Sequence, residues 1–273
     1  MAANVVVVGP ATRQLRARAG AERQNRRPRV ALAGVVAVVV VAWGALIVAE
    51  RSGLARHAHH DAVLDGSGSG WMGIGLFAAG WVVMVVAMMV PFVIPVAVRV
   101  PRGADPLAGP ALAVFVVGFL LAWSVAGTLL LALDAAVHEA VHGVPGLEAR
   151  PWLVATAVLG LAAALQLAPA TERQLARCTL PLPGGTGGVR AAWIAGRDHG
   201  IRCVRADGPL MLVMFAAGAG LAWMALITAA MAGQRWSRGR RHVARATGVA
   251  LLVAAALTAW TPGGLWGPLT LGS

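Results

Sequence analysis

Long runs of apolar residues without charges constrain this chain more than any other feature. Only 12% of its 273 residues are charged, whereas a soluble domain has about a quarter. Most of the runs approach or exceed the roughly 20 residues that cross a bilayer's hydrocarbon core. They are Val30–Ala49, Trp71–Val98, Ala111–Leu133, Trp152–Ala168, Leu210–Ala232 and Val249–Trp260. Because an open sheet cannot satisfy its backbone polar groups in lipid, we predict an all-α, polytopic transmembrane bundle of about six helices.

The positive charge of the chain is carried by arginine alone. The net charge is +12, and the 23 basic residues include no lysine. These arginines lie outside the apolar runs, as charges that set membrane orientation do, so we expect no nucleic-acid partner. Residues 1–29 are predicted to be a basic cytoplasmic tail and not a cleavable signal, because the run that follows is too long for a signal core. Residues 30–268 are then the transmembrane domain of a multi-pass cytoplasmic-membrane protein whose N-terminus faces the cytoplasm.

The charges of the loops agree with these spans only as far as Ala168. The segment from Thr171 to Asp207 is basic and is expected inside, yet the next apolar run is again followed by arginines. A conventional span over Leu210–Ala232 would place those arginines outside, against the positive-inside rule. The alternatives are a hairpin that turns near Gly218 and Gly220, or a further crossing between Val189 and Ile201. We favour the conventional span.

One local motif points to zinc peptidase chemistry. His138, Glu139 and His142 spell H-E-x-x-H, in which two histidines one helical turn apart bind zinc and the glutamate activates water. A peptidase also needs a third protein ligand and a substrate cleft. Glu148 follows His142 closely but beyond Pro145 and Gly146, and the motif lies at the end of an apolar run. We therefore interpret it as a coincidence at the end of a membrane helix.

Other residues carry weaker signals for a softer metal. Met84 and Met88 share a helical face, and thioethers suit Cu(I), although methionine is also an ordinary apolar filler. If the chain around Cys203 is helical, His199 lies on the same face and both could bind a soft metal, as Cys178 could. Unpaired buried thiols would have the same sequence. A tract of His57, His59 and His60 could hold a metal or be a solvated loop.

Several of these residues recur together in one bacterial family. The stretch from Trp81 through Met84, Met88 and Met89 to Pro91 resembles the W-x-x-M-x-x-A-M-M-x-P helix of the predicted metal-binding integral membrane proteins, domain-of-unknown-function family 2182. Leu165–Pro169, followed by Arg173 and Cys178, is similar to that family's Y-Q-L-T-P-L-K-x-x-C-L element. Gly196-x-x-His199-Gly200-x-x-Cys203 is similar to its G-x-x-H-G-x-x-C element. The resemblance covers about residues 75–235 and implies a membrane protein that binds metal, with no reaction assigned.

The chain also departs from the family's pattern. The family has a single histidine near His138, which makes Glu139 and His142 local additions. Two further cysteines follow Cys203 in the family, where this chain has Ala206 and Asp207. An acidic residue follows the family's Trp-Met helix, where this chain has Gln234. A carboxylate in place of a thiolate would harden the metal site or abolish it.

We expect a non-enzyme that binds or handles a transition metal ion, copper first and zinc second. A membrane or periplasmic metalloprotein is an expected partner beside the lipid bilayer. The predicted metal ligands are His199, Cys203, Cys178, Met84, Met88 and His138. The alternatives are a membrane zinc metallopeptidase that uses His138, Glu139 and His142, and an assembly partner of another membrane complex that binds no metal.

Overall fold

The fold is that of an all-helical protein, as predicted. The computed structural model describes residues 33–54, 71–99, 108–144, 146–147, 150, 152–179, 188–217 and 220–261, and within these ranges no β-strand is present. Four helices are long and apolar enough to cross a membrane: Ala33–Arg51, α4 (Trp71–Arg99), α5 (Ala108–His142) and α10 (Arg240–Trp260). A fifth span results if the bent pair α6 (Trp152–Leu167) and α7 (Pro169–Thr179) crosses as one unit.

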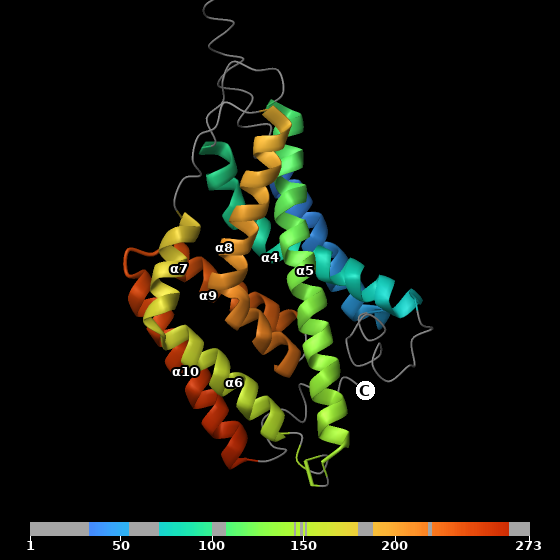
Figure 1. The fold of residues 1–273 in the computed structure, drawn as a ribbon, viewed down its shortest axis with the longest axis vertical. Helices are drawn as coiled ribbons and strands as arrows, with labels where there is room; N and C mark the ends of the chain where they lie inside the picture. Colours follow the sequence, from blue (N-terminus) through green and yellow to red (C-terminus); the bar gives the residue numbers. More distant parts are fainter. Residues whose placement is uncertain are drawn as a thin grey trace, which may run out of the picture.

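The helices α5 and α8 (Gly188–Ala217) run side by side in the same direction (Figure 1). Glycines bring their backbones together. A Cβ atom on Gly196 would lie 2.0 Å from the carbonyl oxygen of Phe115, and one on Gly200 would lie 3.0 Å from that of Phe119. Phe115 of α5 thus lies beside Gly196 of α8, and Phe119 lies beside Gly200. Only small residues at positions 196 and 200 permit the two helices to approach this closely. This contact fixes the part of α8 that follows Gly196.

The bend between α6 and α7 turns the chain toward α8. Pro169 is the first residue of α7, and proline disfavours the helical conformation of the preceding residue, so α6 ends at Leu167 and the two axes differ by 71°. The hydroxyl of Thr171 donates a hydrogen bond to the carbonyl oxygen of Leu165 across the bend. Helix α10 lies along α6 (Figure 1), where Gly248 leaves room for Leu167. The bend directs the end of α7, with Cys178, into the protein interior.

The predicted continuous span over Leu210–Ala232 is wrong. Helix α8 ends at Ala217, and α9 (Leu221–Trp236) begins four residues later. Arg235, near the end of α9, pairs with Asp207 of α8, which shows that the chain reverses between the two helices. Helices α8 and α9 therefore form a hairpin in place of a continuous helix. Helix α10 also begins at Arg240 and not at Val249, so three arginines of the supposed loop lie in its first turns.

Helix α4 lies against α5 and α9 and supplies much of the core. The Trp81 indole Nε1 donates a hydrogen bond of 2.9 Å to the carbonyl oxygen of Trp123 on α5, and its ring lies over Gly127. Met84, Met88 and Met89 are buried in the same core cluster as Phe119 and Cys203. In the helix Ala33–Arg51 only Ala42 is fully buried, and the indole of Trp43 donates a hydrogen bond of 3.2 Å to the carbonyl oxygen of Ala87 on α4. The interior next to α4 is therefore rich in sulfur and aromatic side chains.

Candidate metal centre

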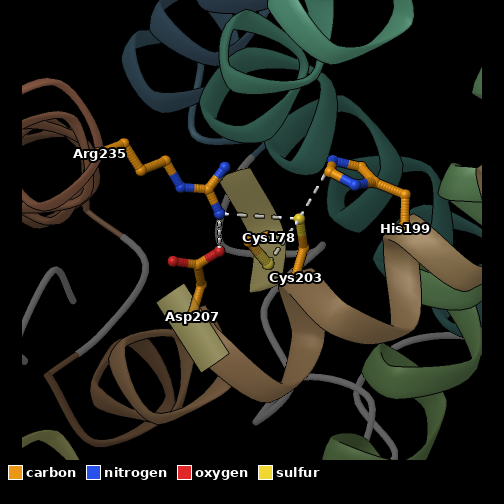
Figure 2. Close-up of polar contacts among 5 residues, drawn as sticks. All are labelled: Cys178, His199, Cys203, Asp207 and Arg235. Atoms are coloured by element: carbon orange, nitrogen blue, oxygen red, sulfur yellow. Dashed lines mark hydrogen bonds and ion pairs between the residues drawn. The ribbon is translucent and has the colours of Figure 1, made fainter. Parts of the chain in front are cut away.

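Three polar residues of α8 lie on one buried helical face. His199, Cys203 and Asp207 follow one another at intervals of four residues, so their side chains point the same way on successive turns. None of the three has any exposed surface. The shared face of His199 and Cys203 confirms the prediction from their spacing. Fully buried histidine and aspartate are unusual unless they have partners, and the partners come from two other helices (Figure 2).

Cys178 joins this face from the end of α7. Its Sγ lies 3.4 Å from Sγ of Cys203, although the two residues are 25 positions apart. This distance exceeds the roughly 2.05 Å of a disulfide bond, and both residues are free cysteines. Both side chains are buried. The fold thus places two thiols in contact within the protein interior.

His199 is held on the other side of Cys203. Its Nε2 lies 3.6 Å from Sγ of Cys203, and its ring packs against those of Phe115 and Phe119 on α5. The close approach at Gly196 and Gly200 makes this packing possible. Nδ1 of His199 has no hydrogen-bond partner within the described residues. The imidazole is therefore oriented by aromatic packing, with Nε2 directed at the thiols.

A buried ion pair completes the cluster. A guanidinium nitrogen of Arg235 pairs with a carboxylate oxygen of Asp207 and also lies 3.7 Å from Sγ of Cys203. The guanidinium packs over the ring of Phe92 on α4, with its carbon 4.9 Å from the ring centroid. Figure 2 shows Arg235 reaching from α9 to both α8 side chains. Sequence reasoning missed Arg235, because an arginine at the end of an apolar run has the appearance of an orientation charge.

The methionine face of α4 adjoins this ion pair. Met84, Met88 and Phe92 follow at intervals of four residues and so lie on one face of the helix. Phe92 contacts Arg235, and Met88 precedes it by one turn. Both methionines are buried. The two predicted thioether ligands thus belong to the same core cluster as Cys178 and Cys203, on the helix whose Phe92 contacts Arg235.

The H-E-x-x-H motif lies elsewhere. His138 is on α5, nineteen residues beyond Phe119, which corresponds to about 28 Å along a helix. His138 is half-buried, and Glu139 is exposed. The structure therefore does not bring His138 together with the cysteines. His57, His59 and His60 lie outside the described residues.

The distances around Cys203 resemble those between ligands of one metal ion. A tetrahedral ion with bonds of about 2.3 Å to sulfur and 2.0 Å to nitrogen separates two sulfurs by roughly 3.8 Å and sulfur from nitrogen by roughly 3.5 Å. The corresponding distances are 3.4 Å and 3.6 Å. Within the described ranges, no group of three or more His, Cys, Asp or Glu side chains is arranged so that it could hold a metal ion. The centre consists of two pairs of possible donors, Cys178 with Cys203 and His199 with Cys203, so Cys203 belongs to both.

Thiols, imidazoles and thioethers are donor types that soft metal ions prefer, and the buried core contains all three. A family model described as PpoB2, copper chaperone, matches residues 78–258, which is more than half of the chain. The chain belongs to this copper chaperone family, and the matched region contains every residue of the cluster. The predicted connection with metal is confirmed to that extent. Comparison with curated proteins and with solved structures gives no match.

Proposed function

We propose that the protein is a membrane copper chaperone that holds Cu(I) between Cys178 and Cys203, with Nε2 of His199 as a third donor. The observation that carries this proposal is the contact of 3.4 Å between two free thiols from different helices. The small widening of the sulfur pair that a bound ion requires can come from a shift at the end of α7. Family membership supports copper as the cargo.

The donor set favours Cu(I) over zinc. Thiolates and thioethers are soft ligands that select Cu(I), and Met84 and Met88 are buried in the same core cluster as the two cysteines. The carboxylate of Asp207, which would harden the site, is already paired with Arg235. We propose that the two methionines receive or pass on the ion and are not its resting ligands.

The exposed surface supports a location in the membrane. Helix α5 presents large apolar side chains to the exterior at every fourth residue, and α10 presents a similar stripe. On α5 they are Val117, Leu121, Val125, Leu129 and Leu133; on α10 they are Val249, Leu252, Val253, Leu257 and Trp260. Soluble proteins rarely expose such continuous apolar patches. We propose that these stripes face lipid.

The hairpin of α8 and α9 removes the conflict among the loop charges. Because the chain reverses between α8 and α9, we propose that the arginines of residues 173–205 and 235–245 face the same side of the membrane. Arg241 and Arg245 both pair with Glu172 of α7, at 3.2 Å and 3.3 Å. With the basic N-terminal tail on the same side, the positive-inside rule places this face in the cytoplasm.

The test is Cu(I) binding to the detergent-purified full chain, measured by competition with a chromophoric Cu(I) chelator. The protein is expected to bind one ion, and Cys178→Ser and Cys203→Ser are expected to bind none at chelator concentrations that the parent withstands. His242→Ala is the matched control for His199→Ala, because His242 is exposed on α10. Equal binding by both cysteine variants and the parent would contradict the proposed function.

A chaperone must pass its cargo on, so we propose a copper-dependent metalloprotein as partner. Family membership favours copper handling over the peptidase and the metal-free assembly roles.

The proposed orientation of the protein in the membrane can be tested separately. A cysteine introduced at Ala140, after Cys178 and Cys203 are replaced by serine, should react with an impermeant reagent in intact cells, and one at Ala17 should not. Labelling at Ala17 would reverse the proposed orientation.

A further inference from the structure

The side chain of Arg235 occupies an unusual position for a metal centre. It is a permanent cation within 3.7 Å of Sγ of Cys203, and only 5% of its side chain is exposed. Asp207 pairs with one guanidinium nitrogen, and Phe92 covers the face of the group. Three helices thus fix a positive charge beside the sulfur that both donor pairs share.

We propose that Arg235 is a specificity-determining residue that favours the monovalent ion Cu(I) and disfavours divalent ions such as Zn(II) at the Cys178–Cys203 site. This inference rests on the proposed function and names the selectivity of the same site. Arg235 would not bind the metal, since guanidinium has no free lone pair to donate. It acts through its charge, at a distance set by α9 and Phe92.

The physical reason is that electrostatic repulsion scales with the charge of the ion. A cation fixed a few ångströms from the metal position opposes a divalent ion about twice as strongly as a monovalent one. Burial reduces screening by water and salt, so the difference persists at physiological ionic strength. Cysteine and histidine alone bind Zn(II) well. A buried arginine next to such ligands therefore supplies discrimination that the ligands themselves lack.

Asp207 limits the effect and keeps Arg235 in place. Its carboxylate contacts the same guanidinium nitrogen that lies 3.7 Å from Sγ of Cys203, and so offsets part of the positive charge there. Removal of Arg235 alone would leave a buried carboxylate without its cation, which is strongly destabilising and could itself bind Zn(II). The decisive variant is therefore the double substitution Asp207→Asn, Arg235→Gln, which removes both charges.

The experiment measures the Kd values for Cu(I) and for Zn(II) of the detergent-purified full chain by chelator competition, for the parent and four variants. The ratio of Zn(II) affinity to Cu(I) affinity should rise by roughly tenfold or more in the double variant. This ratio should rise further in Arg235→Gln. In Asp207→Asn it should fall below the ratio of the parent, because the charge of Arg235 is then uncompensated. Arg235→Lys keeps the charge and should retain most of the selectivity for Cu(I).

A melting curve and helical content for each variant separate selectivity from loss of fold. The inference would be overturned if the double variant folds, binds Cu(I) and has the same affinity ratio as the parent. It would also be overturned if Arg235→Lys has the same affinity ratio as Arg235→Gln. If the double variant does not fold, the opposite shift in Asp207→Asn decides. Failure of the parent itself to bind Cu(I) would instead contradict the proposed function.

Discussion

Two regions of this protein contain residues that could bind a metal ion: the H-E-x-x-H motif near the end of α5 and the cluster around Cys203. They differ in how many helices contribute side chains. The motif on α5 is local: its residues lie within one helix, and Glu139 is exposed. The centre draws side chains from α7, α8 and α9, and His199, Cys203 and Asp207 have no exposed surface. The residues around Cys203 form a less specific sequence pattern than H-E-x-x-H, yet their side chains come together in the structure.

This difference teaches that spacing within one helix is a poor guide to a site when the rest of the ligands must come from other elements. A motif at the end of one helix can form a metal site only if another helix or loop supplies further ligands. Around Cys203 the glycines of α8, the bend at Pro169 and the hairpin after Ala217 together bring those groups in. Four predictions probe the contrast.

Replacement of Cys203 by serine should have the largest effect. Cys203 belongs to both donor pairs, so its loss should lower the affinity for Cu(I) by more than roughly 100-fold, beyond the effect typical of supporting residues. Chelator competition on the purified chain measures it. The double variant His199→Ala, Cys203→Ser should lose more metal than a triple alanine variant of His57, His59 and His60. The reverse order would move the site to the histidine tract.

Replacement of Gly196 by alanine should break the centre indirectly. The new Cβ would meet the backbone of Phe115 at 2.0 Å, so α5 and α8 must separate. The free energy of unfolding should fall by about 1–3 kcal/mol, and copper occupancy should fall with it. A thermal melt with metal analysis measures both. Gly160→Ala on α6 is the matched control, since nothing lies within 4 Å of its Cβ position; equal melting temperatures in the two variants would refute the close contact.

Replacement of both Met84 and Met88 by leucine should have a moderate effect. Leucine keeps nearly the same volume, so the fold should change in stability by less than about 1.5 kcal/mol. Loss of two soft thioethers should slow the uptake of Cu(I) from a chelator complex by roughly tenfold, because thioether donors favour this ion. Stopped-flow absorbance measures the rate. Met72→Leu, on the exposed start of α4, is the control; equal rates in all three proteins would remove the methionines from the pathway.

Replacement of Glu139 by glutamine should have the smallest effect. The side chain is exposed and far from the cysteines, so copper affinity should not change and stability should shift by less than about 0.5 kcal/mol. His138→Ala should likewise leave the copper content unchanged. Loss of a cellular function in Glu139→Gln at constant metal content would revive the peptidase alternative, because that change removes a general base and keeps the metal ligands.

The sequence was sufficient for the all-helical fold and for part of the centre. Apolar runs predict helices directly, and the four-residue spacing predicts the shared face of His199 and Cys203. The sequence favours a continuous span over the hairpin, because Leu210–Ala232 is uniformly apolar and only Gly218 and Gly220 indicate a break. The convergence of Cys178 depends on the bend at Pro169, and that of Arg235 on the hairpin. Long-range geometry of this kind is not contained in local spacing.

The central claim is that Cys178 and Cys203 together bind Cu(I), and X-ray absorption spectroscopy at the copper edge tests it most directly. The detergent-purified full chain, loaded with one equivalent of Cu(I), should show two sulfur neighbours and one nitrogen neighbour of the metal. One sulfur should disappear in Cys178→Ser and again in Cys203→Ser, while Met72→Leu leaves the spectrum unchanged. A shell of nitrogen and oxygen alone, or a sulfur shell that neither cysteine substitution alters, would contradict the account.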